Sequence, residues 1–188
     1  MELNLENSQL LYLKNENDSL RSLLDFKKQL HYLSIPCEVI GLDYSENRKI
    51  IFLNRGGEDN ISENMVCLNS KGLIGKVVEV GNNLCEVICL NDPNSRIPAK
   101  TEQSQEQGIV YGTAKGNILE MRYLSKDTKT ELGEMVITSG LGSIYPKGIL
   151  IGKISSTRID GFYKTATITP AVNFFNLEEV LLIRKETK

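Results

Sequence analysis

A glycine-lysine pair occurs twice in the chain and raises the question of a phosphate-binding loop. The first copy is KGLIGKV (71–77) and the second is KGILIGKI (147–154). A P-loop has the pattern G-x-x-x-x-G-K-[ST], because backbone amides of its turn hold the phosphates and the final hydroxyl binds magnesium. Val77 and Ile154 occupy the hydroxyl position in the two copies. The repeat therefore does not indicate a nucleotide site, and we expect no cofactor.

Ser139, in the segment TSGLG, is the residue that most resembles a catalytic nucleophile. A serine or cysteine nucleophile needs an imidazole base, which a third group orients. The single histidine, His31, lies in the N-terminal segment, ahead of the rest of the chain. Glycoside hydrolysis needs only two carboxylates, but no pair among the 24 acidic residues is singled out by its spacing. We therefore expect no catalytic residues and no enzyme activity.

The four cysteines, Cys37, Cys67, Cys85 and Cys89, form no CxxC pair. A structural zinc site needs four Cys or His ligands at short paired spacings, so no metal is expected. In the run CEVIC, which is typical of a strand, the first and last thiols lie about 13 Å apart and cannot form a disulfide. Buried free thiols are the simpler interpretation, because free cysteine behaves as a small apolar residue.

Composition restricts the class of partner. A net charge of -2 and a pI near 5.6 give no electrostatic reason to bind nucleic acid. The sequence contains no apolar run of about 18 residues and no signal peptide at its start. As written, the chain is expected neither to span a membrane nor to be secreted, unless a further segment precedes it.

The N-terminal residues 1–34 predict a coiled-coil dimerisation helix. Glycine and proline are absent up to residue 33, and leucines recur at alternating steps of three and four residues. An asparagine at an a position fixes register and favours a parallel pair. The alternative is one amphipathic helix that packs on its own domain. The predicted dimer seam consists of Leu3, Leu10, Leu13, Asn17, Leu20 and Leu24.

The remainder of the chain predicts a mainly β fold. Twelve short runs rich in Val and Ile alternate with Gly, Asn and Asp at intervals of about 8–14 residues, which is typical of sandwiches and barrels. We expect two six-stranded barrel-like domains, at 35–105 and 106–188, between which strands can be exchanged. The polar stretch 101–108 is the expected hinge.

The two Lys-Gly segments have a structural explanation in this fold. Each follows a Met-Val strand and a turn, and each leads into a further strand, which indicates an internal duplication. Gly75 and Gly152 are expected at bulges or tight bends where a small barrel closes. Lys76 and Lys153 then point to solvent.

Several motifs carry a family resemblance. DPNSRIP (92–98) and the run from TSGLG (138–142) to PKG (146–148) are the most specific. Together with the N-terminal coil and the apolar runs around them, they resemble the bacterial rod shape-determining family MreC over nearly the whole chain. The segment NRGG (54–57) departs from the family, which more often has Lys-Gly there, and this affects only the local turn.

The resemblance implies a function in the cell-elongation complex, the elongasome. It implies a non-enzymatic scaffold that controls rod shape by binding and activating the class B penicillin-binding transpeptidase of peptidoglycan synthesis. It also implies links to MreD, RodA and MreB, a homodimer or filament, and a position on the periplasmic side of the bacterial inner membrane. The single-pass anchor would lie upstream of Met1. Activation would act by shifting the transpeptidase between conformations.

Exposed aromatic residues are the candidates for partner binding, because aromatic side chains anchor protein interfaces. Phe162 and Tyr163 follow a glycine in a predicted turn and are the preferred pair. One of the adjacent residues Phe174 and Phe175 is expected to face the core. Two alternatives remain, a peptidoglycan-binding β module and a degenerate barrel hydrolase; a sugar-binding groove is less expected because the chain has no tryptophan. The full candidate set is Tyr145, Phe162, Tyr163, Phe174 and Phe175.

Overall fold

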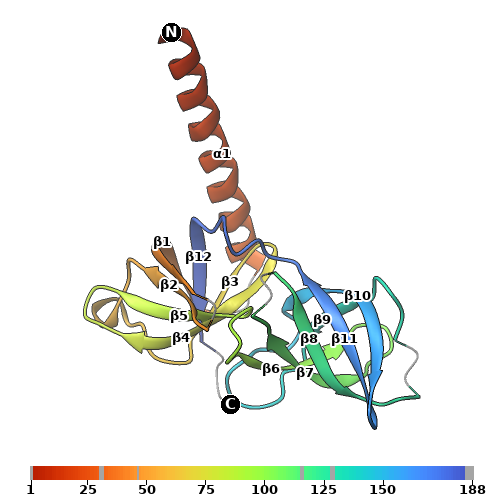
Figure 1. Cartoon of the computed structure of the whole chain (residues 1–188). Coiled ribbons are helices and arrows are strands. Elements are labelled where there is room, and N and C mark those ends of the chain that lie inside the picture. The colour runs from red at the N-terminus through yellow and green to blue at the C-terminus, as the bar shows by residue number, and fades with distance from the viewer. Residues whose placement is uncertain (1, 30–31, 46, 115–116, 128–129, 185–188) are drawn as a thin grey trace.

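The computed structural model of the chain describes residues 2–29, 32–45, 47–114, 117–127 and 130–184. Within these residues it contains one long helix, a short 3-10 helix at Gly57–Asp59 and twelve strands, which form two closed six-stranded barrels. The helix stands on the first barrel, and the second barrel lies beside the first (Figure 1). The predicted mainly β class, with a helix and two small barrels, is confirmed.

The helix α1 spans Glu2–Gln29, a segment without glycine or proline. Two lysines in its last turn complement the negative end of the helix dipole. Its C-terminal part packs on the first barrel, where Leu23 is buried and the hydroxyl of Ser19 donates a 2.8 Å hydrogen bond to the carboxylate of Glu179. Its N-terminal part projects away from both barrels (Figure 1).

The first barrel uses strands from both ends of the β region. Its hydrogen-bonded order is β1-β12-β3-β4-β5-β2, and all neighbouring pairs are antiparallel. Alternate residues point inward, as in β5, where the first, third and fifth residues are buried. The strands are β1 (Ser34–Tyr44), β2 (Lys49–Leu53), β3 (Val66–Asn69), β4 (Gly72–Val80), β5 (Cys85–Cys89) and β12 (Glu179–Ile183).

The second barrel is built from six strands that are consecutive in the chain. Its order is β10-β11-β8-β7-β6-β9, again with antiparallel neighbours throughout. The strands are β6 (Arg96–Thr101), β7 (Gln107–Gly112), β8 (Leu119–Leu124), β9 (Met135–Thr138), β10 (Leu150–Asp160) and β11 (Tyr163–Pro170).

The two barrels share one plan. When β12 is matched with β6, strands β1 to β5 match β7 to β11, and the order around the two barrels is the same. In the second barrel β6 directly precedes β7, whereas in the first the equivalent strand comes from the far end of the chain. The topology therefore agrees with the internal duplication, with one strand of the first barrel supplied by the C-terminus.

Strands β6 and β12 do not lie in the barrels that the expected ranges 35–105 and 106–188 assign to them. β6 precedes residue 105 but belongs to the second barrel, and β12 follows residue 106 but belongs to the first. The ranges 35–105 and 106–188 therefore do not each hold one complete barrel. β6 pairs with β7 and β9 of the second barrel, and β12 pairs with β1 and β3 of the first. Relative to a division of the chain at residue 105, these are the two exchanged strands.

The stretch 101–108 is a turn inside the second barrel, so its expected role as the hinge was wrong. It joins β6 to β7, and the carboxylate of Glu134 accepts hydrogen bonds from two of its backbone N–H groups at 2.6 and 3.0 Å. The chain passes between the barrels earlier, at 90–95. There the buried carboxylate of Asp92 accepts a 2.7 Å hydrogen bond from the backbone N–H of Lys49.

Gly75 and Gly152 occupy equivalent places beside register shifts, in β4 and β10. A Cβ at Gly75 would overlap the carbonyl oxygen of Ile88, and a Cβ at Gly152 would overlap that of Thr169. Both glycines therefore allow one strand to press against the backbone of the next, as expected where a small barrel bends sharply.

The two Lys-Gly segments also meet each other across the boundary between the barrels. Gly72 has a φ of 151°, and a Cβ there would overlap the carbonyl oxygen of Leu150 at the start of β10. The repeated segments thus supply barrel bends and also a direct contact between β4 and β10.

Replacing either corner glycine tests this explanation. We expect Gly75→Ala and Gly152→Ala each to lower the free energy of unfolding by about 2–3 kcal/mol, because the added methyl group meets a fixed carbonyl. Urea unfolding followed by circular dichroism measures the change. Gly57→Ala is the matched control, since a Cβ there lies 3.7 Å from the nearest atom, the carbonyl oxygen of Gly81. Equal unfolding midpoints for all three variants would show that close approach is not the reason for the glycines.

Candidate interaction surfaces

Ser139 lies in a turn that its own polar groups stabilise. Its backbone N–H donates to the carbonyl of Pro98 at 3.0 Å, and its hydroxyl oxygen accepts the N–H of Leu141 at 3.2 Å. His31 lies outside the described residues. Among the residues that are described, no cluster of three or more His, Cys, Asp or Glu side chains is arranged to hold a metal ion. Exposed apolar and aromatic side chains on the barrels and the helix form the candidate surfaces for contact with other molecules.

The four cysteines are free and buried, as expected. Burial raises the pKa of Cys37 from its ordinary value of 9.0 to about 12 and that of Cys85 to about 11. Burial also raises the pKa of Cys89 to about 12 and that of Cys67 well above its ordinary value. Thiols in this state stay protonated at neutral pH and are poor nucleophiles.

Two of the five candidate aromatic residues lie in the core. Phe174 is fully buried, because the connection from β11 back to β12 turns it inward while its carbonyl accepts a 2.9 Å hydrogen bond from the hydroxyl of Tyr44. Tyr145 is also buried, because the segment 139–148 folds back onto Thr138, whose hydroxyl donates to the carbonyl of Pro146. Neither ring is accessible to a partner, so the expectation that Tyr145 and Phe174 bind a partner was wrong.

The other three candidate aromatic residues are exposed but lie apart. Phe175 packs edge-on against Tyr44 of the first barrel, with ring centroids 5.7 Å apart. Phe162 and Tyr163 lie at the turn between β10 and β11 of the second barrel. Phe162 is 87% exposed, with the ammonium of Lys126 5.3 Å from its ring centroid. The preferred pair is thus available for contact.

A row of tyrosines continues from this turn across the outer face of the second barrel. Tyr163 on β11, Tyr123 on β8 and Tyr111 on β7 lie on neighbouring strands, and we call these three residues the tyrosine stripe. Adjacent rings meet edge to face, with centroids 5.8 and 6.3 Å apart. The hydroxyl of Tyr111 donates a 3.4 Å hydrogen bond to that of Tyr123, which raises the pKa of Tyr111.

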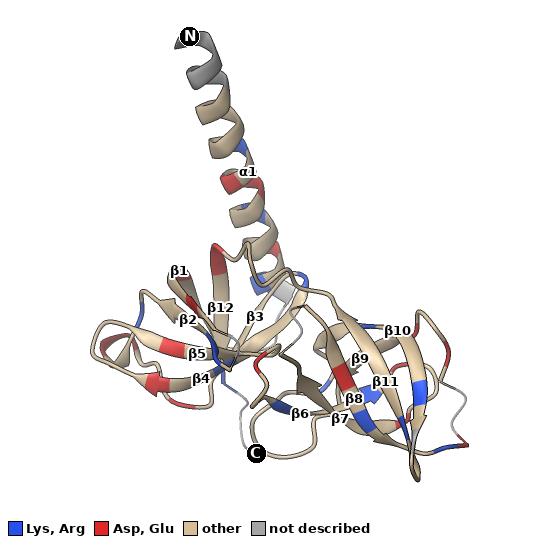
Figure 2. Cartoon of the chain, viewed as in Figure 1, with Lys and Arg blue, Asp and Glu red and all other residues tan. Residues whose placement is uncertain are grey.

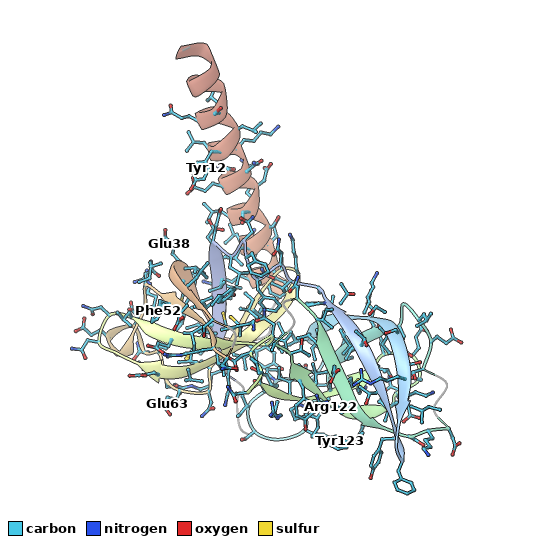
Figure 3. The ribbon with its side chains drawn as sticks, viewed as in Figure 1. Tyr12, Glu38, Phe52, Glu63, Arg122 and Tyr123 are labelled. Atoms are coloured by element: carbon cyan, nitrogen blue, oxygen red, sulfur yellow. The ribbon has the colours of Figure 1, made fainter. Side chains whose placement is uncertain are left out.

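A bulge in β8 turns Tyr123 outward. Lys164 pairs with Leu124 and Ala166 with Met121, so two residues of β8 face one residue of β11. Tyr123 takes a φ of 67°, a conformation that a bulky residue rarely adopts. As a result Arg122 and Tyr123 are both exposed although they are consecutive (Figure 3). No local pattern indicates this bulge, so Tyr123 was missed. Tyr111 was missed as well, although alternation along β7 places it outward and could have found it.

The helix carries a second exposed apolar surface. Leu10, Leu13, Leu20 and Leu24 of the predicted dimer seam are exposed, and Asn17 is exposed between them. The side chain of Leu3 lies outside the described residues. Leu23, which packs on the barrel, is not a seam residue. Packing of the helix base on the barrel therefore leaves the predicted seam uncovered.

Comparison with known proteins gives a consistent result. A family model described as "Rod shape-determining protein MreC, barrel core" matches residues 39–184. The cell shape-determining protein MreC of Listeria monocytogenes is 29% identical over 96% of this chain, which spans 64% of the length of that relative. In the part of the chain that the structure describes, no helix is long and apolar enough to cross a membrane.

Solved structures agree with the sequence comparison. The match to a structure named "MreC" has a TM-score of 0.85 at 26% identity. The matched region covers 91% of this chain and 98% of that structure. A complex between penicillin-binding protein PBP2 and MreC from Helicobacter pylori has a TM-score of 0.65 at 19% identity, covering 81% of this chain and 99% of that one. The second likeness concerns the fold alone.

Thiol reactivity tests the buried state of the cysteines. We expect the native chain to take up no iodoacetamide at pH 8 over minutes, because the thiols are shielded and protonated. After unfolding in guanidinium, mass spectrometry is expected to find all four modified. Rapid modification of even one cysteine in the native chain would contradict the structure around that residue.

Proposed function

The chain belongs to the MreC family of rod shape-determining proteins, and from this premise we propose that it is a non-enzymatic scaffold of the bacterial cell-elongation complex. It controls rod shape by binding and activating the class B penicillin-binding transpeptidase of peptidoglycan synthesis. The observation that carries the proposal is the exposed aromatic surface of the second barrel, Phe162 with the tyrosine stripe.

The chemistry of this surface suits a protein partner. Tyrosine and phenylalanine bring large contact areas, and tyrosine hydroxyls retain hydrogen bonds at the edge of an interface. Phe162 and Tyr163 lie beside a depression that Tyr123 and Lys126 also line, so a partner side chain can enter there. The similar structure from Helicobacter pylori is a complex of PBP2 with MreC, which supports the choice of partner. Activation follows if the transpeptidase binds more tightly in its active conformation.

The exposed seam of α1 supports the proposed self-association. Leucines at positions Leu10, Leu13, Leu20 and Leu24 would pair with those of a second copy, with Asn17 fixing the register of a parallel dimer. Filament formation through the barrels is a further part of the proposal. MreD, RodA and the cytoplasmic MreB filament complete the proposed assembly. In it this chain lies on the periplasmic side of the inner membrane, and its membrane anchor lies outside these 188 residues.

A peptidoglycan-binding module is the second candidate, and the tyrosine stripe is the observation that favours it. Sugars stack on the faces of aromatic rings, whereas in the stripe adjacent rings meet edge to face and Tyr111 carries two guanidinium groups on its ring. These contacts leave less ring face available for a sugar. For this reason we prefer the protein partner.

Binding of the whole chain to a purified class B transpeptidase ectodomain tests the proposal. We expect a double variant, Phe162→Ala with Tyr163→Ala, to weaken binding at least tenfold in surface plasmon resonance, because both rings are anchors. Phe175→Ala is the control, since it removes a comparably exposed ring on the other barrel.

Undiminished binding by a correctly folded double variant would refute the assigned surface. Absence of binding by the unmodified chain, together with its sedimentation on purified peptidoglycan sacculi, would favour the second candidate instead.

A further inference from the structure

Two guanidinium groups lie on one tyrosine ring at the end of the tyrosine stripe. Arg96 on β6 is the direct register partner of Tyr111 on β7, and Arg122 lies on β8, the strand on the other side of β7. Their guanidinium carbons lie 4.3 and 4.6 Å from the centroid of the Tyr111 ring. Cation–π attraction to the ring offsets part of the repulsion between the two cations. We call these three residues the arginine clamp.

The clamp carries more positive charge than its neighbours neutralise. Glu120 forms ion pairs with Arg122 at 2.7 Å and with Arg158 at 3.0 Å. Its pKa is lowered although desolvation acts to raise it, because the hydrogen bonds from these two guanidinium groups outweigh burial. Arg96 donates instead to backbone carbonyls, those of Pro93 and Ser95, at 2.8 Å each. Among the described residues, Glu120 therefore pairs with two guanidinium groups, and no carboxylate forms an ion pair with Arg96.

The two barrels differ in the sign of the charges on their strands (Figure 2). The clamp lies on the basic barrel. The strands of the second barrel carry Arg96, Lys100, Arg122, Lys153, Arg158 and Lys164 against Glu120 and Asp160. The strands of the first barrel carry Glu38, Asp43, Glu79, Glu86 and Glu179 against Lys49 and Lys76.

The clamp lines one wall of a surface depression of about 390 Å³. Pro93 and Ile118 supply apolar parts of its lining, and Ile118 is exposed. Such a volume falls within the range of roughly 300–1,000 Å³ that is usual for ligand sites. The depression is continuous with the tyrosine stripe through Tyr111, so one partner can contact both.

We propose that the arginine clamp binds the carboxylate of an Asp or Glu side chain on the protein partner that covers the tyrosine stripe. Guanidinium groups bind carboxylates through paired charge-assisted hydrogen bonds, and the unneutralised charge favours an acidic ligand. The acidic side chain fixes the orientation of the partner, while the aromatic surface supplies most of the contact area. This inference rests on the proposed function, since the partner there is the transpeptidase.

Arginine side-chain NMR tests the clamp without any transpeptidase. Hexaglutamate is titrated into the whole chain labelled with ¹⁵N, and the Nε resonances are followed. We expect saturable shifts at Arg96 and Arg122, and none at Arg55 of the first barrel, whose guanidinium already pairs with Asp59. A second titration, with inorganic phosphate at equal ionic strength, distinguishes recognition of carboxylates from general binding of anions. Shifts that do not saturate, or that are equal at Arg55, would overturn the proposal.

Variants then connect the clamp with the transpeptidase ectodomain. Arg122→Gln and Arg96→Gln are each expected to weaken binding about tenfold and to reduce its dependence on salt, because a charged contact is lost. Arg96→Lys keeps the charge but lacks the planar guanidinium group, so its affinity is expected to lie between those of the unmodified chain and Arg96→Gln. Arg55→Gln is the matched control. If all clamp variants keep their affinity and salt dependence while the Phe162 and Tyr163 double variant loses binding, the clamp does not bind the transpeptidase. The proposed function would still stand.

Discussion

Closure of the first barrel by the last strand, β12, is the interaction on which the other parts of the molecule depend. β12 pairs with β1 on one side and β3 on the other, and its residues Val180 to Ile183 are buried. Without it, both neighbours would present unpaired edges, which proteins rarely leave exposed. Glu179 at its start also receives the hydrogen bond from Ser19 of the helix. One strand therefore ties the C-terminus, the first barrel and the base of the helix together.

Local sequence signals predicted the kinds of elements but not all of their partners. The absence of Gly and Pro identified the helix, and the repeated Lys-Gly segments identified Gly75 and Gly152 as barrel corners. The place of β12 could not be predicted, because its pairing with β1 joins residues far apart in the chain. The polar composition of 101–108 resembled a linker, and only the distant Glu134 carboxylate shows why it is a fixed turn.

Exposure of the candidate aromatic residues also depends partly on local sequence and partly on packing between distant elements. A glycine turn was enough to expect Phe162 and Tyr163 at the surface, since turns are exposed. One of two adjacent residues generally faces inward, but the burial of Phe174 rather than Phe175 depends on how the last connection packs between elements. The outward position of Tyr123 depends on a bulge set by register with β11. Alternation along β8 predicts one exposed residue where the structure has two.

The two proposed contact surfaces lie on different parts of the molecule, as the proposed scaffold function requires. The seam leucines lie on a helix about 42 Å long, and the tyrosine stripe lies on the second barrel, away from that helix (Figures 1 and 3). The proposed self-association and the proposed partner binding therefore use different surfaces and do not compete. Sedimentation velocity of the chain, alone and mixed with a class B transpeptidase ectodomain, tests this most directly. We expect a dimer for the chain alone and a complex of two chains with two transpeptidases for the mixture. A chain that is monomeric alone and stays free of the ectodomain would contradict both proposed surfaces.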